Sequence, residues 1–194
     1  MNLLILLKCP RCRKTLQGEN NSKVFFCMTC RLGFDISEQP PQKFELFFLD
    51  ARIHKGHPQI YFPFWKFSSD YKIIMDGRQV IGPRMRHFYV PSFFIKNINY
   101  FGDIGYYFSL NNILLEAGTS MDFPVFPADR GLKDSIGYPR IYLYKEESKK
   151  KRKAAIEINI DHKDISIVLI PFYKINSDYY DSIIFWKYPS GALV

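Results

Sequence analysis

Long apolar runs are missing from this 194-residue chain. The N-terminal run from Leu3 to Leu7 has five residues. A membrane-spanning helix needs about 20 apolar residues, and the apolar part of a secretory signal about 7–15. We therefore expect no transmembrane segment and no secretory signal. Glycine-rich phosphate loops are also missing, which argues against an enzyme that binds nucleotides through such a loop.

Cysteine and histidine are scarce, with four residues of each. All four cysteines fall into two Cys-x-x-Cys pairs, so none is left for a Cys/His catalytic pair. His54 and His57 share one short polar stretch, whereas His87 and His162 are isolated. No Ser/His/Asp set can be proposed from this spacing. We expect that the protein is not an enzyme.

The two cysteine pairs are the most specific pattern in the chain. Cys9 and Cys12 form the first pair, Cys27 and Cys30 the second, and 14 residues separate the pairs. A tight turn within each pair directs both sulfurs at one cation, and four thiolates form a tetrahedral set for structural zinc. The gap is close to the roughly 15–20 residues of a common four-cysteine zinc pattern. The sequence therefore predicts a metal site with these four ligands.

Three other interpretations of the sulfurs stay open at this stage. A rubredoxin-like iron site uses the same ligands, and spacing alone does not separate iron from zinc. Disulfides need an oxidising compartment, for which the chain offers no signal. A redox Cys-x-x-Cys usually comes as a single pair at the start of a helix. We expect one structural Zn²⁺ per chain, and reduced thiols place the protein in the cytoplasm.

Short predicted strands flank the second pair of cysteines. Lys23 to Phe26 and Leu32 to Ile36 have the apolar patterns of strands. This order of strand, knuckle, hairpin, knuckle and strand resembles the zinc-ribbon family over residues 1–38. The resemblance implies that the four cysteines hold a structural zinc ion. Many ribbons have glycine after the second ligand, where this chain has Arg13, and we expect Gly33 to supply a permissive backbone beyond the second knuckle.

Residues 39–194 form the second predicted unit, a β-rich domain with an internal repeat. Aromatic residues make up 17% of the chain, which suits strands and contact surfaces. Residues 61–71 and 169–179 match at six positions at an offset of 108. Each segment predicts a strand that begins near a proline and ends in a Ser-Asp turn. We expect a duplicated hairpin, with a pair of equivalent sites at Asp70 and Asp178 as the alternative.

Other patterns favour a mainly β fold, with a β-rich α+β fold as the alternative. The dipeptide at 76–77 predicts a hairpin between apolar runs. Residues 106–110 predict a strand, and residues 156–160 a half-buried strand that ends in a tight turn over 161–164. Residues 139–150 fit either strand or helix. As a whole, the chain is similar to a group of bacterial proteins that join an N-terminal zinc ribbon to Pro-Phe-aromatic strands, a resemblance that implies no particular activity.

Basic residues exceed acidic ones and give a formal net charge of +8. Such a surface attracts polyanions in general, although a run of charge is most simply a solvated face. We expect a non-enzymatic interaction module, an adaptor or accessory subunit of a larger protein assembly, with nucleic-acid binding as the alternative. The candidate phosphate contacts are Arg11, Arg13, Lys14, Arg31, Lys149, Lys150, Lys151, Arg152 and Lys153.

Overall fold

A computed structural model of the protein describes residues 7–53, 58, 60–96, 98–111, 124–150 and 155–192, without the side chains of 98–103, 150 and 192. Strands account for 50% of the chain and helices for 16%, which confirms the mainly β prediction. The histidines at 54 and 57 lie outside the described residues, as do residues 151–153 of the basic run.

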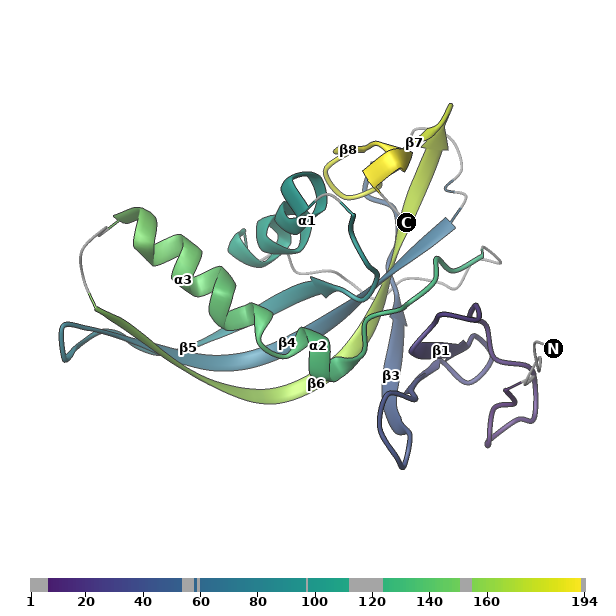
Figure 1. Ribbon diagram of the computed structural model, residues 1–194, viewed down its shortest axis with the longest axis horizontal. Coiled ribbons are helices and arrows are strands. Elements are labelled where there is room, and N and C mark those ends of the chain that lie inside the picture. The colour runs from purple at the N-terminus through teal and green to yellow at the C-terminus, as the bar shows by residue number, and fades with distance from the viewer. Residues whose placement is uncertain are drawn as a thin grey trace.

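One mixed sheet contains all the strands of the described residues (Figure 1). Its strand order is β1-β2-β3-β6-β4-β5, with β7 pairing to β6 and β8 pairing to β7. Among the strand pairs of the described residues, β3 with β6 is the single parallel one. The elements are β1 (Val24–Cys27), β2 (Leu32–Asp35), β3 (Gln42–Phe48), β4 (Ile60–Met75), β5 (Arg78–Pro91), α1 (Ile98–Leu110), α2 (Leu132–Ser135), α3 (Tyr138–Lys150), β6 (Ile156–Ile175), β7 (Asp178–Asp181), β8 (Lys187–Tyr188) and a 3-10 turn over Ser190–Ala192.

Three long strands, β6, β4 and β5, form the largest part of the sheet, with β5 at the end of the strand order, and α1 and α3 lie over them (Figure 1). The hairpin between β4 and β5 turns at Asp76 and Gly77, which have positive φ of 48° and 76°. Both central residues of a two-residue hairpin with a type I′ turn need this conformation, so the predicted hairpin is confirmed. β4 and β6 pair from Ile60 opposite Phe172 to Met75 opposite Ile156.

Only the first residues of the two similar segments pair with each other in β4 and β6. Tyr61 is opposite Pro171, and Pro63 is opposite Leu169, whereas residues 64–71 face residues 160–168. Position 61 corresponds to 169 and position 63 to 171, so these first residues pair with approximate local two-fold symmetry. Whether the segments are copies of one unit stays a prediction. The predicted Ser-Asp turn is wrong in the first segment, because Asp70 lies inside β4. In the second segment a turn is present but falls on Asn176 and Ser177, and Asp178 already belongs to β7.

The predicted strand at residues 106–110 is wrong, because these residues belong to α1. This helix packs against the end of β5, where the Tyr89 N–H donates to Ser109 Oγ at 2.9 Å. A Cβ added to Gly105 would lie 2.3 Å from the Tyr89 carbonyl oxygen, so the close approach needs glycine. A short apolar stretch of a buried helix has the same composition as a buried strand. The local sequence therefore does not distinguish helix from strand here.

The predicted turn at residues 161–164 is also wrong. β6 continues through these polar residues as a strand of 20 residues. The pairing register with β4 shifts between Ser68 and Ser69, which accommodates one extra residue of β6 at Lys163. The polar sequence is explained by exposure, since Asp161, Lys163 and Asp164 all point to solvent.

The aromatic residues of β4 form the core of the protein. Tyr61, Phe62, Phe64, Trp65 and Phe67 are all fully or almost fully buried. Large aromatic side chains supply much of the buried apolar area of a small domain. These residues of the first repeat segment (61–71) are therefore packing residues, and their side chains do not contribute to the surface.

β3 connects the cysteine-bearing strands to the main sheet. Its first half pairs antiparallel with β2, from Gln42 to Glu45, and its second half pairs parallel with β6, from Leu46 to Phe48. The sheet thus continues across residues 38–39, where the sequence predicts a domain boundary. That boundary stays a prediction, but the two parts share one strand.

Candidate metal centre

Four sulfur atoms meet at the N-terminal end of the sheet. The Sγ atoms of Cys9, Cys12, Cys27 and Cys30 all lie within 4.8 Å of one another. Cys12 and Cys27 Sγ are 3.5 Å apart, far beyond the roughly 2.05 Å of a disulfide bond. Zn–S bonds of about 2.3 Å in tetrahedral geometry separate the sulfurs by about 3.8 Å. The cluster therefore has the size that a tetrahedral thiolate site needs.

Two tight turns bring the sulfurs together. Arg13 and Arg31, each directly after the second cysteine of its pair, have φ of 64° and 52°. In the first turn, Cys9 O accepts from the Arg13 N–H at 2.9 Å. The left-handed conformation costs a residue with a side chain about 1–2 kcal/mol. Arginine thus occupies the positions where glycine is favoured, and the metal would be one source of compensation.

The expectation for Gly33 is wrong. This residue lies in β2 and does not supply the left-handed turn, which falls on Arg31. Its lack of a side chain serves packing instead, because an added Cβ would lie 2.4 Å from Ile167 Cδ1. Glycine at this position lets β2 approach the centre of the sheet.

The thiols differ in acidity when no ion is bound. Burial alone would raise the pKa of Cys9, but the backbone N–H groups of Cys12 and Arg11 lower it to about 7. Burial followed by the neighbouring Cys12 sulfur raises the pKa of Cys30 to about 12, and burial also raises the pKa of Cys27. Four thiolates so close together repel one another, and a divalent cation removes that penalty. The donor set fits a tetrahedral, thiolate-preferring metal such as zinc or iron.

The basic residues predicted as phosphate contacts are brought together in part. Arg11, Arg13, Lys14 and Arg31 are all exposed beside the cysteine cluster. Lys149 belongs to α3, where its ammonium lies 5.6 Å from the centre of the Tyr106 ring, and the side chains at 150–153 lie outside the described residues. The knuckle cations therefore lie together, whereas Lys149 is the one residue of the run at 149–153 whose side chain the structure describes.

The serine–histidine contacts of the structure were not predicted from the sequence. Ser68 Oγ lies 3.0 Å from His87 Nδ1, and Ser69 Oγ lies 2.7 Å from His162 Nδ1. Both hydroxyls are buried in β4, and burial lowers the pKa of both imidazoles. Since the register of β4 determines these pairs, only correct strand pairing could have found them. They satisfy buried polar groups at the strand irregularity.

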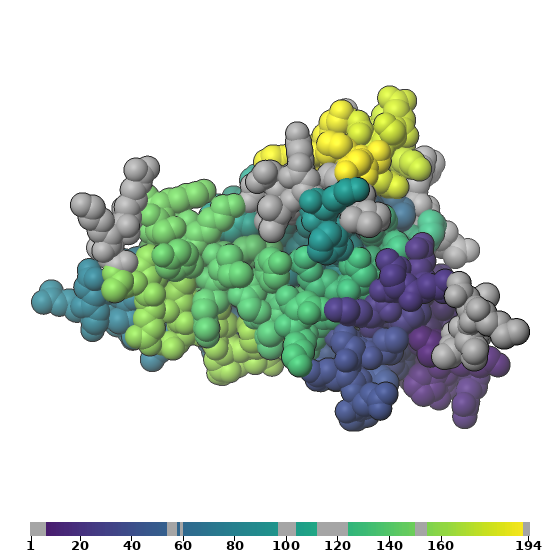
Figure 2. All heavy atoms as spheres, viewed as in Figure 1, coloured from purple at the N-terminus to yellow at the C-terminus, as the bar shows by residue number. Residues whose placement is uncertain are grey.

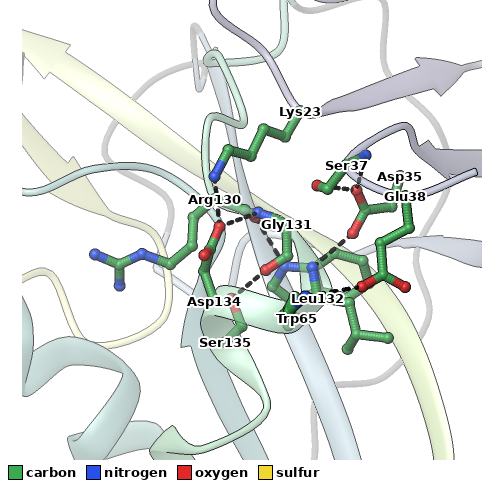
Figure 3. Close-up of polar contacts among 11 residues, drawn as sticks. Lys23, Asp35, Ser37, Glu38, Trp65, Arg130, Gly131, Leu132, Asp134 and Ser135 are labelled. Carbon is green, nitrogen blue, oxygen red and sulfur yellow. Dashed lines mark hydrogen bonds and ion pairs between the residues drawn. The ribbon is translucent and has the colours of Figure 1, made fainter.

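A polar joint at the end of the β1–β2 hairpin away from the cysteines was also missed. Asp35 and Lys23 contact residues of α2 about 100 positions later in the chain (Figure 3). No local signal in the sequence links positions so far apart.

No protein-family model matches this sequence, and no curated protein and no solved structure matches it. Within the described part of the chain, no helix has the length and apolar character needed to cross a bilayer. Function must therefore be argued from the geometry of this molecule.

Proposed function

We propose that the protein is a non-enzymatic zinc-ribbon interaction module, an adaptor or accessory subunit of a larger protein assembly. The four cysteines supply the zinc site, and the metal makes up for the small core of the N-terminal strands. Among the described residues, the core cluster around the sulfurs has three buried members, Cys9, Cys27 and Phe34, while Val24 and Phe26 of β1 belong to the main core. A unit with so little buried apolar area depends on a metal or a similar staple.

The observation that supports binding to a protein partner is an exposed apolar patch on the outer face of α3. Tyr142 and Leu143 are buried against the sheet, yet Ile141 and Tyr144 are 56% and 54% exposed. Residues three apart are neighbours on a helix, so these two side chains form one exposed apolar patch. A helix with apolar residues on both faces is typical of a helix covered on both sides. In Figure 2, the green residues that include α2 and α3 lie at the surface of the molecule, beside the N-terminal residues in purple and blue.

The experiment is native purification at low salt, comparing three forms of the protein. The wild type should retain a partner protein in stoichiometric amount. The double variant Ile141→Glu/Tyr144→Glu should lose it, because charged side chains oppose burial in an apolar interface. Ile175→Glu, which changes an exposed apolar residue at the end of β6, should retain it. A wild type that purifies as a monomer without a partner, or a partner that the double variant still binds, would contradict the proposal.

Nucleic-acid binding is the second candidate, and the exposed cations of the knuckles favour it. Arg13 and Arg31 follow two cysteines whose sulfurs lie within 4.8 Å, so both arginines flank one site. Arg11, Arg13 and Lys14 form no ion pair with another described residue. Titration with single- and double-stranded nucleic acid at two salt concentrations tests this candidate. Arg11→Gln/Lys14→Gln should weaken binding and reduce the slope of log K against log salt by about 0.7–0.9 for each lost contact. Binding without salt dependence would refute it.

A further inference from the structure

Residues 124–135 run across the end of the cysteine-bearing strands. The N–H groups of Lys23 and Val24 both donate to the Ala128 carbonyl, at 2.7 and 3.0 Å. Lys23 Nζ lies 2.7 Å from Asp134 Oδ2, and this ammonium lowers the pKa of Asp134. Ala128 thus pairs with Val24 in an isolated antiparallel bridge, which covers the start of β1 on the side away from β2.

Asp35, at the end of β2, makes the second set of contacts. Its side chain is only 4% exposed. Asp35 Oδ2 accepts from the Leu132 N–H at 2.6 Å, while Oδ1 accepts from the Ser37 N–H at 2.9 Å. A Cβ added to Gly131 would lie 2.2 Å from Ser37 Oγ and 2.9 Å from Asp35 Oδ2. The joint is therefore close-fitting, and Figure 3 shows Asp35 and Ser37 directed at the start of α2.

The same segment is tied to the centre of the sheet on its other side. The Trp65 indole N–H donates to the Arg130 carbonyl at 3.1 Å, and the Arg130 N–H donates to the Ser92 carbonyl at 2.9 Å. Ser135 Oγ donates to the Gly131 carbonyl at 2.9 Å. Residues 128–135 are thus held between the N-terminal strands and the buried face of β4.

The positions of Lys23 and Asp35 depend on the cysteine centre. Lys23 precedes β1, which ends at Cys27, and Asp35 ends the strand that begins two residues after Cys30. β1 and β2 have four residues each; β2 is also paired with β3, whereas β1 is the last strand of the sheet order. A strand this short at the end of a sheet is held by few backbone hydrogen bonds and needs further support. A metal at the four sulfurs would fix both strands at the knuckle end. The two contact residues lie at the opposite end of the same hairpin.

We infer that occupancy of the cysteine centre controls the docking of residues 128–135. The inference rests on the proposed structural metal. Loss of zinc releases this segment, although its contacts lie at the opposite end of the hairpin from the sulfurs. The coupling is carried by a contiguous set of hydrogen bonds from Lys23 and Asp35 to α2.

Trp65 reports directly on this joint. The chain has two tryptophans, so Trp186→Phe leaves the Trp65 indole as the single tryptophan signal in a ¹⁵N–¹H spectrum. In the zinc-loaded variant, this resonance should be sharp, and the Leu132 amide should be protected from exchange. Removal of zinc with a chelator should shift or broaden the indole resonance and speed exchange of the Leu132 amide by at least about tenfold. The Ile158 amide, in the β4–β6 pairing, should keep its protection.

Three outcomes would overturn the inference. The first is an unchanged Trp65 resonance and Leu132 exchange rate after chelation. The second is loss of protection at Ile158 together with Leu132, which would indicate global unfolding instead of local release. The third is a zinc-loaded Asp35→Asn variant with wild-type exchange at Leu132, because Asp35 accepts from the Leu132 N–H and its loss should partly reproduce chelation. Metal content measured on the same samples separates failure of the coupling from failure of the zinc site itself.

Discussion

Replacing Asp35 with asparagine should weaken the joint between β2 and α2 at almost constant side-chain volume. The buried carboxylate accepts from three donors, the Leu132 N–H and the N–H and hydroxyl of Ser37. Asparagine has one carbonyl oxygen, so its amide nitrogen must face at least one of these donors. A hydrogen bond to a charged group contributes about 1.5–3 kcal/mol, and an orphaned buried donor costs about 1–3 kcal/mol. We expect Asp35→Asn to lower the free energy of unfolding by about 3 kcal/mol.

Urea unfolding measures this loss. With a slope of about 2 kcal/mol per molar urea, the midpoint should fall by about 1.5 M. Glu38→Gln is the matched control, because Glu38 is nearby and pairs with Lys133 at 3.5 Å on an exposed surface. An exposed pair contributes little, so the control should stay within about 0.5 kcal/mol of wild type. If Asp35→Asn behaves like Glu38→Gln, the joint does not stabilise the fold and the reasoning fails.

Three further substitutions test other parts of the account. Gly105→Ala should lower the melting temperature, because the added Cβ would lie 2.3 Å from the Tyr89 carbonyl oxygen and such overpacking costs about 1–3 kcal/mol. The control Gly137→Ala places its Cβ in open space and should leave the melting temperature unchanged. Arg13→Gly should raise the urea midpoint of the zinc-loaded protein by relieving up to about 1 kcal/mol of left-handed strain, whereas Arg13→Gln should leave the midpoint unchanged. Burial lowers the pKa of His162, so its stabilising effect is present above the pKa of the unfolded chain and is lost as the pH falls through the folded value. His162→Asn should therefore flatten the decline of the urea midpoint between about pH 7 and pH 5, and an unchanged decline would exclude His162 as its source.

Local chemistry explains what the sequence predicts correctly. The Cys-x-x-Cys spacing determines which sulfurs converge, and the Asp-Gly turn at 76–77 determines the β4–β5 hairpin, because both depend on a few adjacent residues. The alternation of apolar and polar residues at 156–160 likewise reflects one strand with one covered face. In these places short-range geometry and the final fold agree.

Long-range contacts explain the errors. Residues 106–110 are helical because Gly105 and Ser109 fit against the end of β5, a contact that their own pattern does not reveal. Ser69 and Asp70 remain in a strand because β6 pairs along the full length of β4. The contact between Asp35 and Leu132 spans 97 positions and needs the whole fold. The joint between the cysteine unit and α2 could therefore be found only in three dimensions.

The central claim is that four cysteines hold one structural zinc ion, and elemental analysis of the reduced, natively purified protein tests it most directly. The account predicts close to one equivalent of zinc per chain, lost in the variant Cys9→Ser/Cys12→Ser together with the dispersed amide signals of residues 7–35. Iron in place of zinc would correct the metal but keep the site. Protein that contains no metal at all, or a double variant that keeps its full equivalent of zinc, would contradict the claim.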